Sequence, residues 1–391
     1  MRISAIQMLI PIALEAVEME LQEEVRSLAG ERYGRGKTIR RWGQNPGSIY
    51  LGDQKVKIEV PRLRSRETGK AVQLMGYGQL QNPGIIEESA LNRVINGISQ
   101  RKYEKAVLSV PQSFGISRQS VSRKWIRASG KRLEELMNRS LKDQEIAAVI
   151  IDGKHFGENE MIVALGITMK GEKIILGFIE SSTENYEVCR DFMQELAGRG
   201  LNKKEGVLFI LDGGKGLYKG VKAVFGEQAF IQRCQWHKRE NVLKYLNEKE
   251  KPVYRRKLQS AYESLSYDQA KKKLGIIKND LRRINESAVR SLEEGFEETL
   301  TLHKLGVFEA LGTSLKTTNC LENVNRMLGI YTDRVARWTS SDQRRRWVGT
   351  ALLEIEPRLR RIKGYKNLLQ LRSAMRNYLT EKYPTQFLKA A

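Results

Sequence analysis

Two segments of this 391-residue chain share one pattern, in which an apolar run ends in an aspartate followed by a glycine. One segment is Ala148–Gly153 (AVIIDG), and the other is Leu208–Gly213 (LFILDG). Such apolar runs are typical of strands that are buried on both faces of a sheet. Because neighbouring parallel strands end at the same edge of a sheet, we expect Asp152 and Asp212 to lie close together.

The residues around these two runs predict an α/β fold. Apolar strands and amphipathic helices alternate along this part of the chain. Their order is three strands, a helix, a strand, a helix and a strand, which predicts a mixed sheet covered by helices on both faces. We expect strands at 146–151, 161–168, 173–180, 207–211 and 229–233, and helices at 184–196 and 215–225.

Paired carboxylates at one sheet edge indicate a cation site. Two such groups in a partly dry crevice repel each other unless a divalent ion neutralises them. Carboxylate-only ligation suits Mg²⁺ or Mn²⁺. Each Asp-Gly pair taken alone is equally compatible with a simple turn, so the hypothesis depends on the repeated pattern of Asp152 and Asp212.

A third carboxylate, Glu322, follows a predicted helix start. Thr318 or Asn319 can cap this helix, which places Glu322 near its first turn, where the helix dipole favours an acid. Glu322 is therefore a candidate third ligand, although from the residues alone a capping role explains it as well. Between Asp212 and Glu322 the chain is too long for a loop, and residues 238–313 have a helical, highly charged pattern, with the last helix expected at 302–311.

The net charge of +22 and the sequence pI of about 9.8 favour a polyanionic partner. Basic residues recur in every segment of the chain. Three sparse cysteines (Cys189, Cys234 and Cys320) build no disulfide framework, which favours a reducing cytoplasm. No apolar run approaches the length of a membrane span, so we expect no membrane association.

The N-terminal part predicts a helix at 4–29, followed by two strands at 48–51 and 56–60. Gly52-Asp53 suits a hairpin turn between these strands. Pro61 is expected to end the second strand, because proline lacks the backbone donor that a sheet uses. We expect the basic residues 62–66 to form a loop.

A candidate helix-turn-helix follows within a region of helical pattern. Its first helix is expected at 103–108, its turn at 114–116, and its second helix at 118–128 with Ser117 as the cap. A helical hairpin that does not touch DNA is the alternative. The second helix carries side chains that can reach phosphates or base edges, namely Arg118, Gln119, Ser122, Arg123, Lys124 and Arg127.

Further motifs match a known family in order. The two Asp-Gly pairs are followed by Arg233-Cys234-Gln235-Trp236-His237-Lys238, and then by the segment from Thr318 to Arg326, TNCLENVNR. This order resembles that of the Mutator-like transposases, in particular their bacterial insertion-sequence branch, over nearly the whole chain.

The resemblance implies an RNase H-like catalytic core that an all-α insertion interrupts, in a DDE-type transposase. It implies that Asp152, Asp212 and Glu322 are the catalytic triad and hold two Mg²⁺ or Mn²⁺ ions per active site. Cys234 and His237 match the family signature, with His237 close to the scissile phosphate or supporting the carboxylates. From spacing alone the same pair is also half a zinc site, and we expect His155 to pack near the site.

The implied function is binding of terminal inverted repeats, DNA cleavage and joining of the 3′-OH to target DNA. The partners are double-stranded DNA and further copies of the chain, as a homodimer or higher oligomer in the synaptic complex. A structure-specific nuclease or resolvase and a domesticated DNA-binding regulator are the alternatives. Basic residues expected to hold DNA near the C-terminus are Arg326, Arg344, Arg345 and Arg346.

The patterns also divide the chain into five parts. Residues 1–82 comprise the N-terminal helix and hairpin, for DNA-end binding or dimerisation, and 83–145 the helix-turn-helix domain. The catalytic core is expected to begin at 146–237 and to resume at 318–391 with basic helices. The all-helical insertion occupies 238–317 between these two parts.

Overall fold

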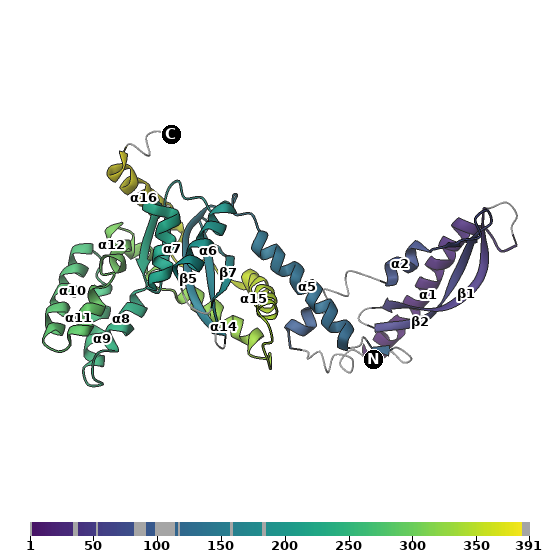
Figure 1. Cartoon of the computed structure of the whole chain (residues 1–391), viewed down its shortest axis with the longest axis horizontal. Helices are drawn as coiled ribbons and strands as arrows, with labels where there is room; N and C mark the ends of the chain where they lie inside the picture. The colour runs from purple at the N-terminus through teal and green to yellow at the C-terminus, as the bar shows by residue number, and fades with distance from the viewer. Residues whose placement is uncertain are drawn as a thin grey trace. The chain divides into compact units, whose positions relative to one another are not determined.

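A computed structural model describes residues 2–33, 38–51, 54–81, 91–97, 114–115, 118–156, 159–181 and 185–384 (Figure 1). The chain separates into two compact units, Met1–Lys131 and Arg132–Ala391. In its described part, no helix combines the length and apolar character that a membrane crossing requires.

The first unit packs a long helix on a small antiparallel sheet. The helix is α1 (Arg2–Ala29), and a short helix α2 (Met75–Gln81) follows the sheet. Apolar side chains of α1 such as Leu21 and Val25 meet Ile49, Ile58 and Leu63 in a buried core. The strands are β1 (Ile39–Leu51), β2 (Gln54–Ser65), β3 (Ala71–Val72) and β4 (Phe114–Gly115).

The predicted N-terminal helix and hairpin are confirmed, but Pro61 does not end the second strand. β2 continues to Ser65, so the expectation of a loop at 62–66 is wrong. Pro61 is opposite Gln44, where β1 has a bulge between Arg41 and Gln44. A bulge relaxes the regular ladder, and this accommodates a residue without a backbone donor.

The candidate helix-turn-helix is described only in part. Helix α5 (Arg118–Asn138) starts where the second helix was predicted and runs ten residues beyond its expected end at 128. Phe114 and Gly115 form the short strand β4 beside β2, so the expectation of a turn at these two residues is wrong. The predicted first helix at 103–108 lies outside the described residues.

The second unit is built on a mixed sheet in the order β7-β6-β5-β8-β9. β5, β8 and β9 run parallel, whereas β6 and β7 are antiparallel to their neighbours. β8 and β9 match the predicted bounds to the residue. The strands are β5 (Ile146–Phe156), β6 (Asn159–Thr168), β7 (Lys173–Ser181), β8 (Val207–Leu211) and β9 (Ala229–Arg233).

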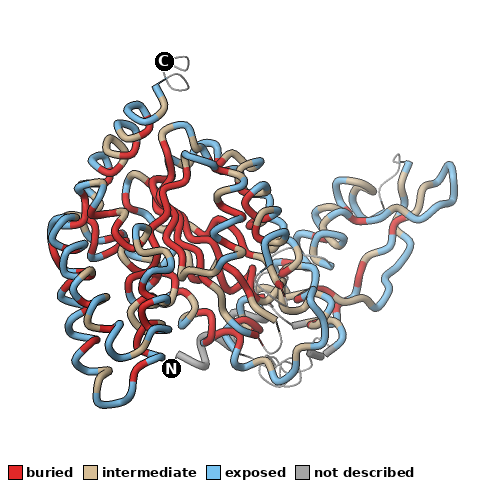
Figure 2. Tube along the Cα trace, turned by 60° about the vertical axis from the view of Figure 1, so that its left-hand side comes forward, coloured by how far each residue is buried: buried red, intermediate tan, exposed pale blue. Residues whose placement is uncertain are grey.

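Helices cover both faces of this sheet, as its continuous apolar runs predict. Side chains of α6 and α7 pack with alternate residues of the strands, including Val149, Phe209 and Ile231. The opposite face meets α14 and α16 at β5 and α15 at β7. Figure 2 shows the central strands as the most continuously buried part of the unit. The helices are α6 (Tyr186–Gly198), α7 (Lys215–Phe225), α14 (Asn319–Thr332), α15 (Ser341–Ile355) and α16 (Leu368–Lys382).

Between β9 and α14 the chain is helical and has its own apolar core, which includes Leu258, Leu274 and Val289. This segment covers the edge strand β9, because Gln232 bonds with Thr299 and Leu302, and Thr301 donates to the carbonyl of Ile231. Its helices are α8 (Gln235–Leu243), α9 (Lys251–Tyr262), α10 (Tyr267–Arg282), α11 (Glu286–Glu293), α12 (Thr301–Lys304) and α13 (Phe308–Leu315).

One helix boundary in this segment was predicted wrongly. The apolar pattern at 302–311 predicted a single helix, but the structure divides it between α12 and α13. Gly306 has a φ of +68° and interrupts the helical backbone between the two. Glycine adopts this conformation at little cost, and it therefore permits the break.

Candidate active site

Asp152 and Asp212 emerge side by side from the middle of the sheet. The parallel ladder between β5 and β8 ends with Ile151 opposite Leu211; Asp152 is the next residue of β5, and Asp212 directly follows the end of β8. Ile151 packs with the α6 and α7 layer, so alternation turns Asp152 toward the opposite face, where α14 lies. Asp152 is only 9% exposed.

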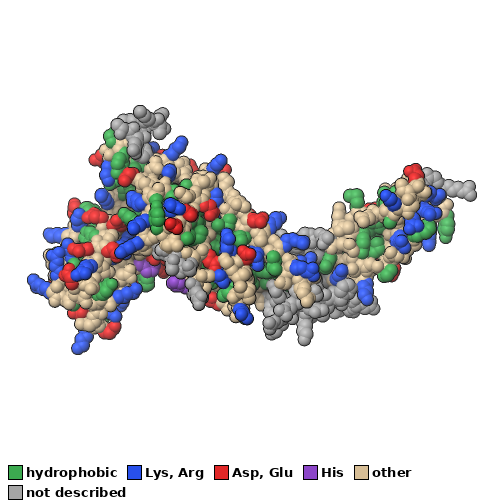
Figure 3. Space-filling model, in the orientation of Figure 1, with side chains coloured by type: hydrophobic (Ala, Val, Ile, Leu, Met, Phe, Trp, Pro, Cys, Tyr) green, Lys and Arg blue, Asp and Glu red, His purple; other side chains and the backbone are tan. Residues whose placement is uncertain are grey.

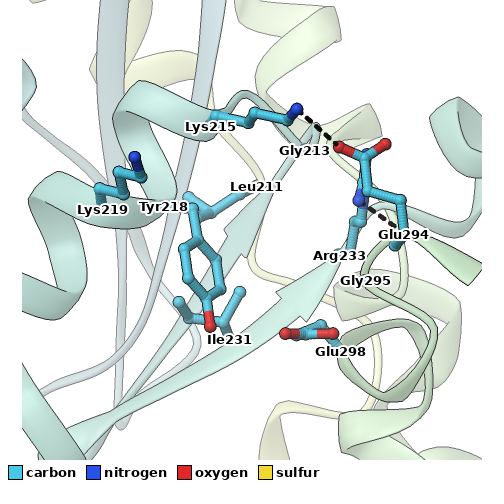
Figure 4. Close-up of a pocket in the computed structure, with 10 residues that line it drawn as sticks. All are labelled: Leu211, Gly213, Lys215, Tyr218, Lys219, Ile231, Arg233, Glu294, Gly295 and Glu298. Atoms are coloured by element: carbon cyan, nitrogen blue, oxygen red, sulfur yellow. Dashed lines mark hydrogen bonds and ion pairs between the residues drawn. The ribbon is translucent and has the colours of Figure 1, made fainter. Parts of the chain in front are cut away.

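The glycine after each aspartate lies close to a neighbouring side chain. A Cβ atom at Gly153 would lie 1.9 Å from the carboxylate Oε1 of Glu160. At Gly213, φ is +116° and a Cβ would lie 2.3 Å from Nε of Arg233, which comes from the next strand (Figure 4). The Glu160 side chain is flexible and can move aside, so only Gly213, with its positive φ, requires glycine.

Glu322 is in the first turn of α14, as predicted, and α14 is fixed against β5. Nζ of Lys154 on β5 donates a hydrogen bond of 2.7 Å to the carbonyl of Asn325. Thr318 precedes the helix but makes no side-chain cap to its backbone. Its hydroxyl instead donates to Oε1 of Glu322 at 3.4 Å, so Thr318 orients the acid.

Cys234 and His237 are at the start of α8, directly after β9. Cys234 is fully buried, and its backbone N–H donates to the carbonyl of Leu211 at 2.7 Å. The hydroxyl of Thr318 lies 3.5 Å from Nδ1 of His237 and 3.7 Å from the sulfur of Cys234. Nε2 of His237 lies 3.9 Å from Oε1 of Glu322.

Thr318 is the site residue that sequence reasoning missed, since the sequence indicated only a capping role. The residue is fully buried, and its single hydroxyl contacts His237, Cys234 and Glu322. No spacing rule reveals its contacts with Cys234 and His237, because these join segments more than 80 residues apart in the chain.

The charges of the three acids act on one another. Burial, then the charge of Asp212, raises the pKa of Asp152 to about 7, and Glu322 adds to the rise while His237 opposes it. Burial alone would lower the pKa of His237, but the hydrogen bond and charge of Cys234, with Asp152 and Asp212, raise it to about 9. The predicted triad and His237 therefore lie within electrostatic reach of one another.

The carboxylates and His237 lie near one another, but their positions are not yet those of metal ligands. Across the ranges that the structure describes, no three His, Cys, Asp or Glu side chains are already arranged as ligands of one metal ion. His155, expected near the site, is exposed on the part of β5 beyond Asp152.

The residues proposed for DNA contact differ in their environments. On α5, Gln119, Arg123 and Arg127 are exposed, and Ser122 and Lys124 are half-buried. The side chain of Arg118 lies outside the described residues.

Among the C-terminal candidates, Arg326 is exposed, whereas Arg344 forms an ion pair with Glu180 and is only 16% exposed. Arg345 and Arg346 are half-buried. Figure 3 shows Lys and Arg side chains spread over the displayed face among Asp and Glu, as the sequence suggested.

Two buried cations meet at the end of α11, and one of them, Arg233 of β9, joins the sheet to the helical segment. Lys238 on α8 is fully buried and donates to the carbonyls of Ser291 and Glu294. Arg233 also donates to the carbonyl of Glu294, at 2.8 Å. Burial, then the charge of Arg233, lowers the pKa of Lys238 to about 8. A cavity of about 280 Å³ adjoins this junction, with Tyr218 on one wall (Figure 4).

Comparison with known proteins gives a consistent result. A profile of the family described as "Transposase, Mutator family" matches residues 5–357. The transposase for insertion sequence element IS256 in transposon Tn4001 of Staphylococcus aureus is 25% identical, over 88% of this chain and 84% of that protein. The transposase for insertion sequence element ISRM5 of Rhizobium meliloti (strain 1021) is 26% identical, over 92% of this chain and 89% of that protein.

Proposed function

Because this chain belongs to the Mutator family of transposases, it is a DNA transposase, and we propose that Asp152, Asp212 and Glu322 form its catalytic triad. The observation that carries the proposal is that Asp152 and Asp212 directly follow the last paired residues of the parallel strands β5 and β8, while Glu322 lies in the first turn of α14, which packs on β5. We also propose that the mixed sheet with helices on both faces is an RNase H-like core, which the helical segment between β9 and α14 interrupts.

The three acids fit divalent cations in their chemistry. Their donors are carboxylates, which Mg²⁺ and Mn²⁺ prefer, and their mutual repulsion is the condition that a cation relieves. Two such ions would activate the attacking hydroxyl and neutralise charge on the departing oxygen. Asp152, Asp212 and Glu322 would hold these ions.

In this proposal, Thr318 and His237 have different roles beside the three acids. Thr318 orients Glu322 and His237, and in the metal-free protein Cys234, Asp152 and Asp212 raise the pKa of His237 to about 9, which favours its protonated form. We infer that His237 stabilises negative charge on the scissile phosphate, because it is a cation 3.9 Å from Glu322.

The reaction then has two steps at one site. Water attacks the phosphorus, the bond to the 3′ oxygen breaks, and that oxygen takes a proton to become a free 3′-OH. This hydroxyl attacks a target phosphodiester in the same way and releases the target strand's own 3′-OH. No covalent link between protein and DNA is needed.

DNA contacts in this proposal come from basic side chains that the fold leaves accessible. Arg123 and Arg127 on α5, and Arg326 on α14, are exposed. We propose that α5 contacts the terminal inverted repeats as the second helix of a helix-turn-helix. Pairing of two ends implies at least a dimer in the active complex.

The experiment is a cleavage and joining assay with a duplex that carries the ends of the element, a target duplex, and Mg²⁺ or Mn²⁺. We expect nicking at the 3′ end and joining by the wild-type protein, and loss of both in Asp152→Asn, Asp212→Asn and Glu322→Gln. Asp191→Asn changes an exposed carboxylate on α6 in the same way and should leave both activities intact.

Wild-type cleavage by any one triad variant would remove that residue from the triad. Cleavage without joining would favour a structure-specific nuclease. Binding of the duplex should persist in all three triad variants, since they change the site's charge and not the fold.

A further inference from the structure

The first unit has opposite charges on its two sides. Helix α1 contains five glutamates and two arginines, and exposed acids at its surface include Glu15, Glu18, Glu20 and Glu23. Strands β1 and β2 together contain six Lys and Arg residues and one acid, Glu59. Because α1 packs on one face of the sheet, Lys57 and Arg64 lie on the other, whereas Arg41 donates to the carbonyl of Gly30 at the end of α1.

The register places these cations along the outer face of the two strands, with Lys57 seven residues along β2 from the pair formed by Arg40 and Arg64. Val56, Ile58 and Val60 are buried toward α1, so Lys57 points outward between them and is exposed. Arg40 is paired with Arg64 across the two strands. Like charges in directly opposed positions repel each other and destabilise the strand pair, and a bound anion would relieve this repulsion.

An aromatic ring lies beside this pair. The guanidinium carbons of Arg40 and Arg64 are 4.4 and 4.7 Å from the centre of the Trp42 ring. Trp42 is nevertheless 42% exposed, next to the bulge at Gly43. A large aromatic surface that stays exposed between two cations can contact sugar and base edges while the cations contact phosphates.

From these observations we propose that the outer face of β1 and β2 around Arg40, Trp42, Lys57 and Arg64 binds the DNA duplex. We call this surface the β-ribbon face. β1 and β2 pair alone between the short contacts of β2 with β4 and β3 at its two ends, and a two-stranded ribbon has dimensions that fit a DNA groove. The acidic surface of α1 would be repelled by phosphates. This inference rests on the proposed function, because it assigns a second duplex contact to the transposase in addition to α5.

The test measures equilibrium binding without metal, so it does not depend on cleavage. Fluorescence anisotropy of a labelled duplex with the element's end, and of an unrelated duplex, is recorded for the full chain over a series of salt concentrations. Each phosphate contact contributes about 0.9 to the slope of log affinity against log salt. Arg40→Ala with Arg64→Ala should therefore lower the slope by about two and weaken binding at least tenfold on both duplexes.

The matched control removes the same charge elsewhere in the unit. Arg26 and Arg32 are exposed and lie outside the β-ribbon face, so their double alanine variant should change the slope by less than one. Trp42→Phe should weaken binding several-fold without altering the slope. Lys57→Glu provides an independent test, since this exposed side chain can change without loss of buried contacts.

An unchanged slope in both the Arg40–Arg64 double variant and Lys57→Glu would overturn the inference. An equal decrease of the salt slope in the Arg26–Arg32 control variant would also overturn the inference, because the change in net charge alone would then explain the weaker binding. If cleavage still depends on the triad while the β-ribbon variants bind normally, only this inference fails. If the triad variants cut DNA normally, the proposed function fails whatever the binding data show.

Discussion

Asp152→Asn exchanges a buried carboxylate for a neutral amide of similar size, so its effect on stability should depend on pH. Burial and the neighbouring acids raise the pKa of Asp152 from 3.8 to about 7 in the folded, metal-free protein. The folded state therefore holds this proton more tightly than the unfolded chain. As a result, the wild-type protein loses stability as pH rises from about 4 to about 7.

The size of the effect follows from the same shift. A rise of about three pKa units, at about 1.36 kcal/mol each, lowers the free energy of unfolding by at most on the order of 4 kcal/mol. This loss of stability is complete above pH 7 and absent below about pH 4. The neutral amide of the variant would not incur this cost. We expect Asp152→Asn to stabilise the metal-free protein by a few kcal/mol at pH 8.5 and by roughly half as much or less at pH 5.

The assay is thermal unfolding of the full chain with EDTA at several pH values between 5 and 8.5. For units of this size, each kcal/mol changes Tm by roughly 2–4 °C. Asp191→Asn is the control, because this carboxylate is 61% exposed and its amide should change Tm little at any pH. If Asp152→Asn raised Tm by the same amount at every pH, or lowered Tm at pH 8.5, the electrostatic reasoning would be refuted.

Two further changes test the packing around the site. Gly213→Ala should destabilise the protein by at least about 2 kcal/mol in a denaturant titration, since its φ is +116° and the new Cβ would meet Arg233. Gly198→Ala is the control, because a Cβ there has open space and should leave the stability unchanged or slightly raise it. Lys238→Met should lower stability by about 1–3 kcal/mol, because the carbonyl of Ser291 loses its bond from Lys238 while that of Glu294 keeps only the bond from Arg233; an unchanged denaturation midpoint would contradict the role given to this lysine.

The strands and helices that position the site were predictable because their local sequence pattern favours the same structure that packing in the core requires. The run that ends at Asp212 is buried on both faces, and β8, α7 and β9 have the predicted bounds. In contrast, a bulge opposite Pro61 allows β2 to continue beyond the proline. The positive φ of Gly306 divides a run that is apolar enough for one helix.

The site itself was only partly accessible from sequence. The Asp-Gly repeats indicated where two acids meet, but the contact of Thr318 with His237 and the ion pair of Arg344 with Glu180 join segments far apart in the chain. Such contacts depend on tertiary packing, which residue spacing does not encode. The pairing of Arg40 with Arg64 beside one tryptophan depends likewise on strand register.

The proposal that three acids hold metal ions for DNA cleavage is tested most directly by titrating Mn²⁺ into the protein bound to a duplex with the element's end. Isothermal calorimetry should give two Mn²⁺ ions per active site for the wild-type protein, and fewer or much weaker sites for Asp152→Asn, Asp212→Asn and Glu322→Gln. Unchanged stoichiometry and affinity in all three variants would contradict the assignment of these carboxylates as the metal site.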